Sequence, residues 1–172
     1  MCLMTDRKIA LKAFIEALKE CLDFDFNVSK FDHRLKMQKL VYLAKVMGVP
    51  NLNYDYSLYL RGPYSQALAD DYYDLSHEKN LDSIAEETQK IMKNEAFKRF
   101  SELVKDKDGT WLEVATTTVE LNKSIKRLVK AHIIDEKDRY NVLKKLIKNR
   151  KPFASRNLIE EIVGELKENN LI

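Results

Sequence analysis

Only four glycines and three prolines occur in the 172 residues, and this scarcity constrains the fold more than any other feature. These two residue types are the strongest interruptions of regular structure. Most of the long uninterrupted segments place apolar residues every three or four positions, as Leu11, Phe14 and Leu18 do, which is the period of one helix face. We therefore expect a mainly α fold with about seven helices in one compact domain.

Apolar spacing and capping signals together locate the expected helices. Gly48 suits the left-handed position after a helix end, Ser65 and Ser155 are typical N-caps, and Asp135 is a third candidate cap. Cys21 continues the apolar stripe of the first helix, so we expect it in the core. The helices are expected at about residues 6–22, 32–47, 66–75, 81–93 and 95–105, then from Trp111 toward His132, after Asp135 and after Ser155.

One segment departs from helical spacing. Residues 54–60 alternate apolar and polar side chains and are rich in tyrosine, which favours a short β-strand. The Gly62-Pro63 pair then ends the strand. No other segment stands out as its partner. The sequence thus predicts a minor β element beside the helices.

Size and composition bound the class of protein. With 45% apolar and 33% charged residues, a chain of this length can bury roughly 70% of its unfolded surface without a metal or disulfide. No segment approaches the roughly 18 apolar residues of a membrane span, and residues 1–8 lack the order of a signal peptide. We expect a cytoplasmic protein with no membrane partner. One domain over 1–172 is expected, with a division into 1–122 and 123–172 as the alternative.

Basic residues are concentrated in the last third. Residues 123–172 contain 13 Lys or Arg against 7 Asp or Glu. This excess allows nucleic-acid binding, with contacts expected from Lys144, Lys148, Arg150 and Lys151. The last two helices loosely suggest a helix-turn-helix, but their connection is long and the final helix carries four glutamates that would repel phosphates. A winged-helix-like packing without DNA binding is equally allowed, and so is plain solvation of helix faces by lysine.

Catalytic and metal motifs are not recognisable. The histidines His33, His77 and His132 are isolated from one another and from cysteine, and no zinc or calcium spacing occurs. Asp70 and Asp71 are neighbours whose side chains would point about 100° apart on a helix, which does not suit an acid–base pair. We expect no catalytic residue, no metal and no cofactor, and thus not an enzyme; an enzyme of unfamiliar type is the least favoured reading.

The most distinctive patch combines two segments, KMQKLVYLA at residues 36–44 and YLRGPYS at residues 59–65. Polar and aromatic groups on a rigid corner would suit an interaction site. The alternative is a structural corner with a helix cap and packed tyrosines. The expected surface comprises Gln38, Lys39, Tyr42, Arg61, Gly62, Pro63, Tyr64, Ser65, Asp70 and Asp71.

These two segments resemble a prokaryotic family, the YwgA-type proteins, whose members read approximately KLQKLxYL and then GPYS. More distantly they resemble the Panacea domain of SocA-like antitoxins. The resemblance covers most of residues 34–172, including TWLEVATTT and the final helix. The Panacea resemblance implies a toxin-neutralising or protease-adaptor role based on protein binding. The chain departs from the Panacea pattern at Tyr64-Ser65 and lacks the tryptophan that often precedes the corner.

We therefore expect a small regulatory or protein-interaction domain, antitoxin-like or adaptor-like, whose partner is another protein. Nucleic-acid binding through the basic last third is the alternative.

Overall fold

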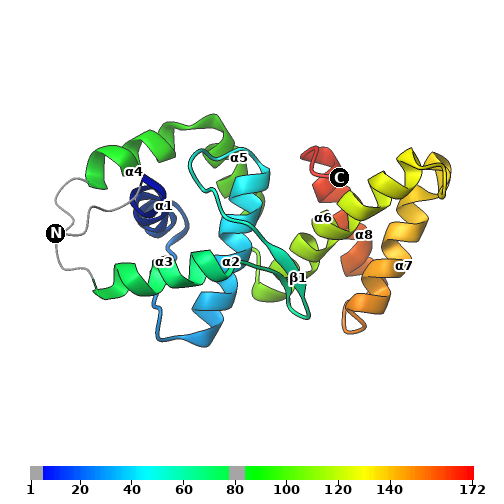
Figure 1. Ribbon diagram of the computed structural model, residues 1–172, viewed down its shortest axis with the longest axis horizontal. Coiled ribbons are helices and arrows are strands. Elements are labelled where there is room, and N and C mark those ends of the chain that lie inside the picture. The colour runs from blue at the N-terminus through cyan, green and yellow to red at the C-terminus, as the bar shows by residue number, and fades with distance from the viewer. Residues whose placement is uncertain (1–5, 78–83) are drawn as a thin grey trace. The chain divides into compact units, whose positions relative to one another are not determined.

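The computed structural model describes residues 6–77 and 84–172, and in these residues eight α-helices, one short 3₁₀ helix and a two-stranded hairpin make up the regular structure (Figure 1). The expectation of a mainly α fold with a minor β element is confirmed. The elements are α1 (Asp6–Leu22), α2 (Phe31–Val46), β1 (Ser57–Tyr59), β2 (Gly62–Tyr64), α3 (Gln66–His77), α4 (Ile84–Lys93), α5 (Glu95–Val104), α6 (Gly109–Lys130), η1 (Glu136–Asp138), α7 (Arg139–Arg150) and α8 (Arg156–Glu168).

The chain forms two compact units. Unit 1 comprises residues up to Ser57 and from Tyr64 to Lys107, and unit 2 comprises Leu58–Pro63 and Asp108–Ile172. Residue 122, at which the sequence allowed a division, lies inside α6. Because that helix is unbroken from Gly109 to Lys130, residues on both sides of position 122 belong to one element.

Unit 1 is built on α1, which packs against α3 and α4, and on α2, which packs against α3 and α5. Phe14, Phe97 and Phe100 are buried and form an aromatic cluster with ring centroids 5.6–5.9 Å apart. Cys21 is exposed rather than part of this core. The buried apolar stripe ends at Leu18, and Glu20 and Cys21 in the last turn of α1 are exposed.

Unit 2 contains α6, α7 and α8, which all contact one another, and the hairpin turn. Thr116, Thr117 and Thr118 are buried in α6, although β-branched residues are weak helix formers. Each hydroxyl donates to a backbone carbonyl one turn earlier, at 2.7–2.8 Å. Burial of the methyl groups and satisfaction of the hydroxyls outweigh the low helix propensity.

The helix ends follow most of the sequence signals. The Ser65 and Ser155 hydroxyls accept from the amides of Leu68 and Leu158, at 3.3 Å and 3.1 Å. Gly48 has a φ of 92°, as expected. Asp135 makes no side-chain cap bond, and a 3₁₀ turn leads into α7 instead. The expected helix at 81–93 is described from Ile84 onward, and residues 81–83 lie outside the described residues.

The hairpin supplies the strand partner that the sequence did not reveal. The expected strand at 54–60 shortens to β1, and β2 pairs with it directly after a tight turn. Gly62 has a φ of 96°, a conformation that favours glycine, so the Gly-Pro pair starts a strand rather than only ending one. No helix among residues 6–77 and 84–172 is long and apolar enough for a membrane crossing.

Candidate functional site

The glutamine of the KMQKLVYLA segment is an internal clasp. Gln38 is 1% exposed, and its side-chain amide bonds the backbone of Ser65 in both directions. Its Nε2 donates to the Ser65 carbonyl and its Oε1 accepts from the Ser65 amide, both at 2.9 Å. The side chain thus pairs with the backbone as a second peptide group would, and it fastens the start of α3 to α2.

The predicted interaction surface needs correction. Gln38, Lys39, Tyr42, Ser65 and Asp71 are buried, so they do not offer contacts to a partner. The first three lie on α2, which packs against α3 and α5. Ser65 is bonded to Gln38, and Asp71 to Arg7 and Tyr54. Gly62 and Pro63 are buried as well. Of the predicted set, only Arg61 and Asp70 are exposed and Tyr64 is half-buried.

A second clasp, which the sequence did not reveal, surrounds Asp71. The Asp71 carboxylate accepts from Arg7 Nε and from the Tyr54 hydroxyl, each at 2.8 Å. The Arg7 guanidinium also lies 4.8 Å from the centroid of the Tyr54 ring. One turn along α3, Asp74 binds Lys8 at 2.6 Å. The sequence contains a basic pair, Arg7-Lys8, and two acids spaced by three on a helix, Asp71 and Asp74. Because 64 residues separate Arg7 from Asp71, the sequence alone did not show that these groups meet.

The electrostatics of this clasp are those of a structural contact. The hydrogen bond to Asp71 raises the pKa of Arg7. Burial, and then the bond to Asp71, raise the pKa of Tyr54. Burial alone raises the pKa of Tyr56, whose hydroxyl is buried and has no hydrogen-bond partner among the described residues. All three groups therefore keep their protons at neutral pH and are poorly suited to transferring them.

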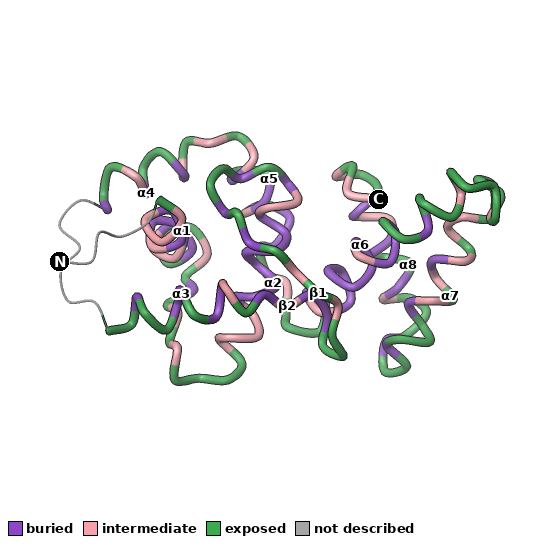
Figure 2. Tube along the Cα trace, in the orientation of Figure 1, coloured by how far each residue is buried: buried purple, intermediate pink, exposed green. Residues whose placement is uncertain are grey.

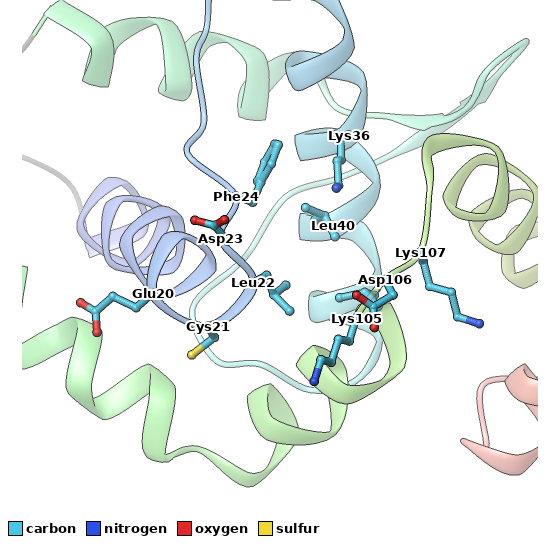
Figure 3. Close-up of a pocket in the computed structure, with 11 residues that line it drawn as sticks. Glu20, Cys21, Leu22, Asp23, Phe24, Lys36, Leu40, Lys105, Asp106 and Lys107 are labelled. Carbon is cyan, nitrogen blue, oxygen red and sulfur yellow. The ribbon is translucent and has the colours of Figure 1, made fainter.

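A crevice of about 400 Å³ opens in unit 1 where α1 and α5 end (Figure 3). Asp23 and Asp106, in the loops after these helices, have left-handed backbones with φ of 52° and 61°. Lys36 lies 4.8 Å from the centroid of the Phe24 ring on another wall. The lining mixes acids and lysines, so the crevice has no single sign of charge.

Cys21 is the one thiol lining this crevice. Partial burial, and to a lesser degree Glu20, raise its pKa, so the reactive thiolate is disfavoured at neutral pH. No group of three or more His, Cys, Asp or Glu residues within 6–77 and 84–172 is arranged to hold a metal ion. We assign no reaction to this crevice.

Lys151 is buried, which corrects its expected role as a nucleic-acid contact. It is 1% exposed, and its ammonium donates to Glu113 Oε1 and to the backbone carbonyl of Leu60, both at 2.6 Å. A lysine enclosed in this way is not available to phosphates. It instead fixes the hairpin turn to the start of the α7–α8 connection, within unit 2.

Two of the three remaining candidates are also engaged inside unit 2. Lys144 forms an ion pair with Glu160 at 2.6 Å. Lys148 donates to the carbonyls of Pro152 and Ala154 at 2.9 Å and 2.8 Å. Arg150 is exposed. The basic surplus of the sequence is thus partly consumed by internal contacts.

Several large apolar side chains of unit 2 are exposed. Leu60 is 86% exposed and Tyr59 is 59% exposed, and we call Tyr59, Leu60 and Arg61 the hairpin tip (Figure 2). Phe153, in the α7–α8 connection, is also 59% exposed. The predicted surface includes Arg61 but not Tyr59 or Leu60, although both belong to the YLRGPYS segment, because alternation alone does not show which side of a strand is covered.

Comparison of the chain with protein families, with curated proteins and with solved structures finds no match. The resemblance to YwgA-type proteins and to the Panacea domain stays a prediction.

Proposed function

We propose that this protein is a regulatory or protein-interaction domain, antitoxin-like or adaptor-like, that binds another protein through the hairpin tip. The observation that supports this most is the exposure of Tyr59 and Leu60 on a backbone that a buried ion pair holds in place.

Exposure is the first argument. A large apolar side chain that is 86% exposed, as Leu60 is, gains nothing from folding and loses solvent contact only when a partner covers it. Leu60 lies between Tyr59 and Arg61 in the chain. Tyrosine and arginine are among the residue types enriched at binding hot spots. Two of the three side chains of the tip are therefore of types enriched at interface centres, and the exposed leucine between them adds apolar surface.

Rigidity is the second argument. The Leu60 carbonyl is held by Lys151, whose charge is in turn matched by Glu113. A fixed backbone reduces the conformational entropy that binding must remove, so the apolar contacts contribute more to affinity. Phe153 lies two residues after Lys151 in the chain, which places a third exposed apolar side chain beside the same anchor.

The site-level observations favour binding over catalysis. Among the buried polar groups of unit 1, Gln38 is bonded to the Ser65 backbone and Asp71 to Arg7 and Tyr54, and the hydroxyls of Tyr54 and Tyr56 keep their protons. The resemblance to the Panacea domain agrees with protein binding. A cytoplasmic location belongs to the same proposal.

Affinity capture from a nuclease-treated native lysate tests this function. We expect a specific protein to be retained by the tagged wild-type chain and lost from the Leu60→Ser variant. Ile133→Ser is the matched control, because Ile133 is 69% exposed in the same unit but lies in the connection after α6. Circular dichroism should show that both variants are folded.

Two outcomes would contradict the proposal. One is equal loss of the captured protein from the Leu60→Ser and Ile133→Ser variants, which would indicate a nonspecific apolar contact. The other is capture that disappears on nuclease treatment, which would indicate a nucleic acid as the bridging molecule.

A further inference from the structure

The α7–α8 groove is a second feature of unit 2 that the hairpin tip does not explain. It has a volume of about 510 Å³ and is lined by Lys144, Lys145, Lys148, Arg156, Ile159 and Glu160, together with Asn141. Four cations and one carboxylate therefore line a surface groove whose floor includes an isoleucine. Figure 1 shows the two helices that form it.

The cations lie in a regular array. Lys144, Lys145 and Lys148 follow one another at helical spacing on α7, and Asn141 continues the same face. From Asn141 to Lys148 the helix advances roughly 10 Å at 1.5 Å per residue. Arg156 contributes from α8 on the other side of the groove.

Two of the four cations are already satisfied and two are not. Lys144 pairs with Glu160, and Lys148 is tied to the carbonyls of Pro152 and Ala154. The side chains of Lys145 and Arg156 make no hydrogen bond or ion pair within the described residues of unit 2. Arg156 is moreover the first residue of α8, where the helix dipole disfavours a cation and favours an anion. An anion placed there would be attracted by the Arg156 guanidinium and by the positive end of the α8 dipole.

We propose that the α7–α8 groove binds an acidic peptide segment of a partner protein. Its carboxylates would pair with Lys145 and Arg156, and an apolar side chain would lie over Ile159 and the aliphatic stems of the lysines. This inference adds the chemistry of the partner to the proposed function. It fails separately from that function, because capture through the hairpin tip requires neither Lys145 nor Arg156.

An acidic peptide fits the α7–α8 groove better than a nucleic acid does, because carboxylates lie in and beside the groove. Glu160 lies within the groove and Glu161 follows it on the exposed surface of α8. A polynucleotide carries a charge at every phosphate and would bring some of them against these carboxylates. A peptide can place its acids opposite Lys145 and Arg156 and neutral side chains opposite Glu160.

Fluorescence anisotropy with three labelled probes tests the proposal. The probes are a peptide rich in Glu and Leu, the same peptide with Gln in place of Glu, and a single-stranded oligonucleotide. We expect the acidic peptide to bind, the Gln peptide to bind at least about tenfold more weakly, and binding to weaken with salt. The Lys145→Glu/Arg156→Glu double variant should lose about tenfold or more in affinity for the acidic peptide.

The matched control is Lys126→Glu/Lys130→Glu, which makes the same change in net charge on the exposed end of α6. It should change the affinity by less than about twofold if the contact is local. Equal losses in the two double variants would overturn the groove as the site. Equal binding of the two peptides, preference for the oligonucleotide, or no binding of the acidic peptide would each overturn the proposal.

Discussion

The two units hold neighbouring parts of one chain segment by different kinds of bond. In unit 1, the neutral amide of Gln38 pairs with the backbone of Ser65, just after β2. In unit 2, the charged ammonium of Lys151 binds the carbonyl of Leu60, just after β1, and is neutralised by Glu113. Both side chains are about 1% exposed.

This comparison distinguishes a residue of a distinctive sequence motif from a residue that a partner can reach. Gln38 belongs to the segment that is most distinctive in the sequence, and it is internal. Leu60 belongs to the second segment of the same distinctive patch but is not among the predicted contact residues, and it is the most exposed of the large apolar side chains described. A distinctive motif can therefore be the framework of a site, while the side chains that meet a partner are carried by the turn which that framework positions.

The largest effect is expected from removing the neutral clasp. Gln38→Ala should lower the free energy of unfolding by roughly 4 kcal/mol, because it leaves the Ser65 amide buried without a partner and creates a cavity. Urea unfolding followed by circular dichroism measures this. Gln66→Ala, which removes an exposed amide bonded to Asp70 and, at 3.5 Å, to the Tyr64 hydroxyl, is the control and should cost less than about 0.5 kcal/mol. Similar losses in both variants would contradict the clasp.

A somewhat smaller effect is expected from removing the charged anchor. Lys151→Met should cost about 3 kcal/mol, toward the lower end for a broken buried pair, because the Glu113 side chain is 22% exposed and can be partly hydrated. Trp111, the single tryptophan, lies in unit 2 and reports its unfolding by fluorescence. Lys126→Met, at an exposed position of α6 in the same unit, should be close to neutral.

The anchor also connects stability to binding. If Lys151 positions the hairpin tip, folded Lys151→Met protein should capture less of the partner than Lys126→Met protein does. An unchanged free energy of unfolding in the Lys151→Met variant would show that other contacts replace the lost ion pair. Unchanged capture would show that the tip needs no fixed backbone.

The smallest effects come from two tyrosines of unit 1 that differ in one bond. Tyr54→Phe should cost about 1–2 kcal/mol, because the buried carboxylate of Asp71 loses a hydrogen bond. Tyr56→Phe should change stability by less than about 0.5 kcal/mol or increase it, since its buried hydroxyl has no partner among the described residues. Urea unfolding compares the two, and a larger loss for Tyr56→Phe would mean that its hydroxyl is bonded.

Local features of the sequence predicted the local features of the structure. The ends of α1 and α5 were predicted to within one residue, and the Ser65 and Ser155 caps are present, because periodicity and caps depend on residues close together in the chain. Cys21 was predicted wrongly for the same reason: an apolar spacing shows which residues share a face but not where the covering helices stop.

What only the tertiary structure decided is which polar side chains face inward. Gln38 and Ser65 are 27 residues apart, Arg7 and Asp71 are 64 apart, and Leu60 and Lys151 are 91 apart. A glutamine, an aspartate or a lysine in a sequence is by default a surface residue, and it is buried only where folding brings a matching partner to it. The sequence by itself therefore determined the helices, their caps and the position of the corner. The fold decided that the corner is internal and that the hairpin tip is the exposed part.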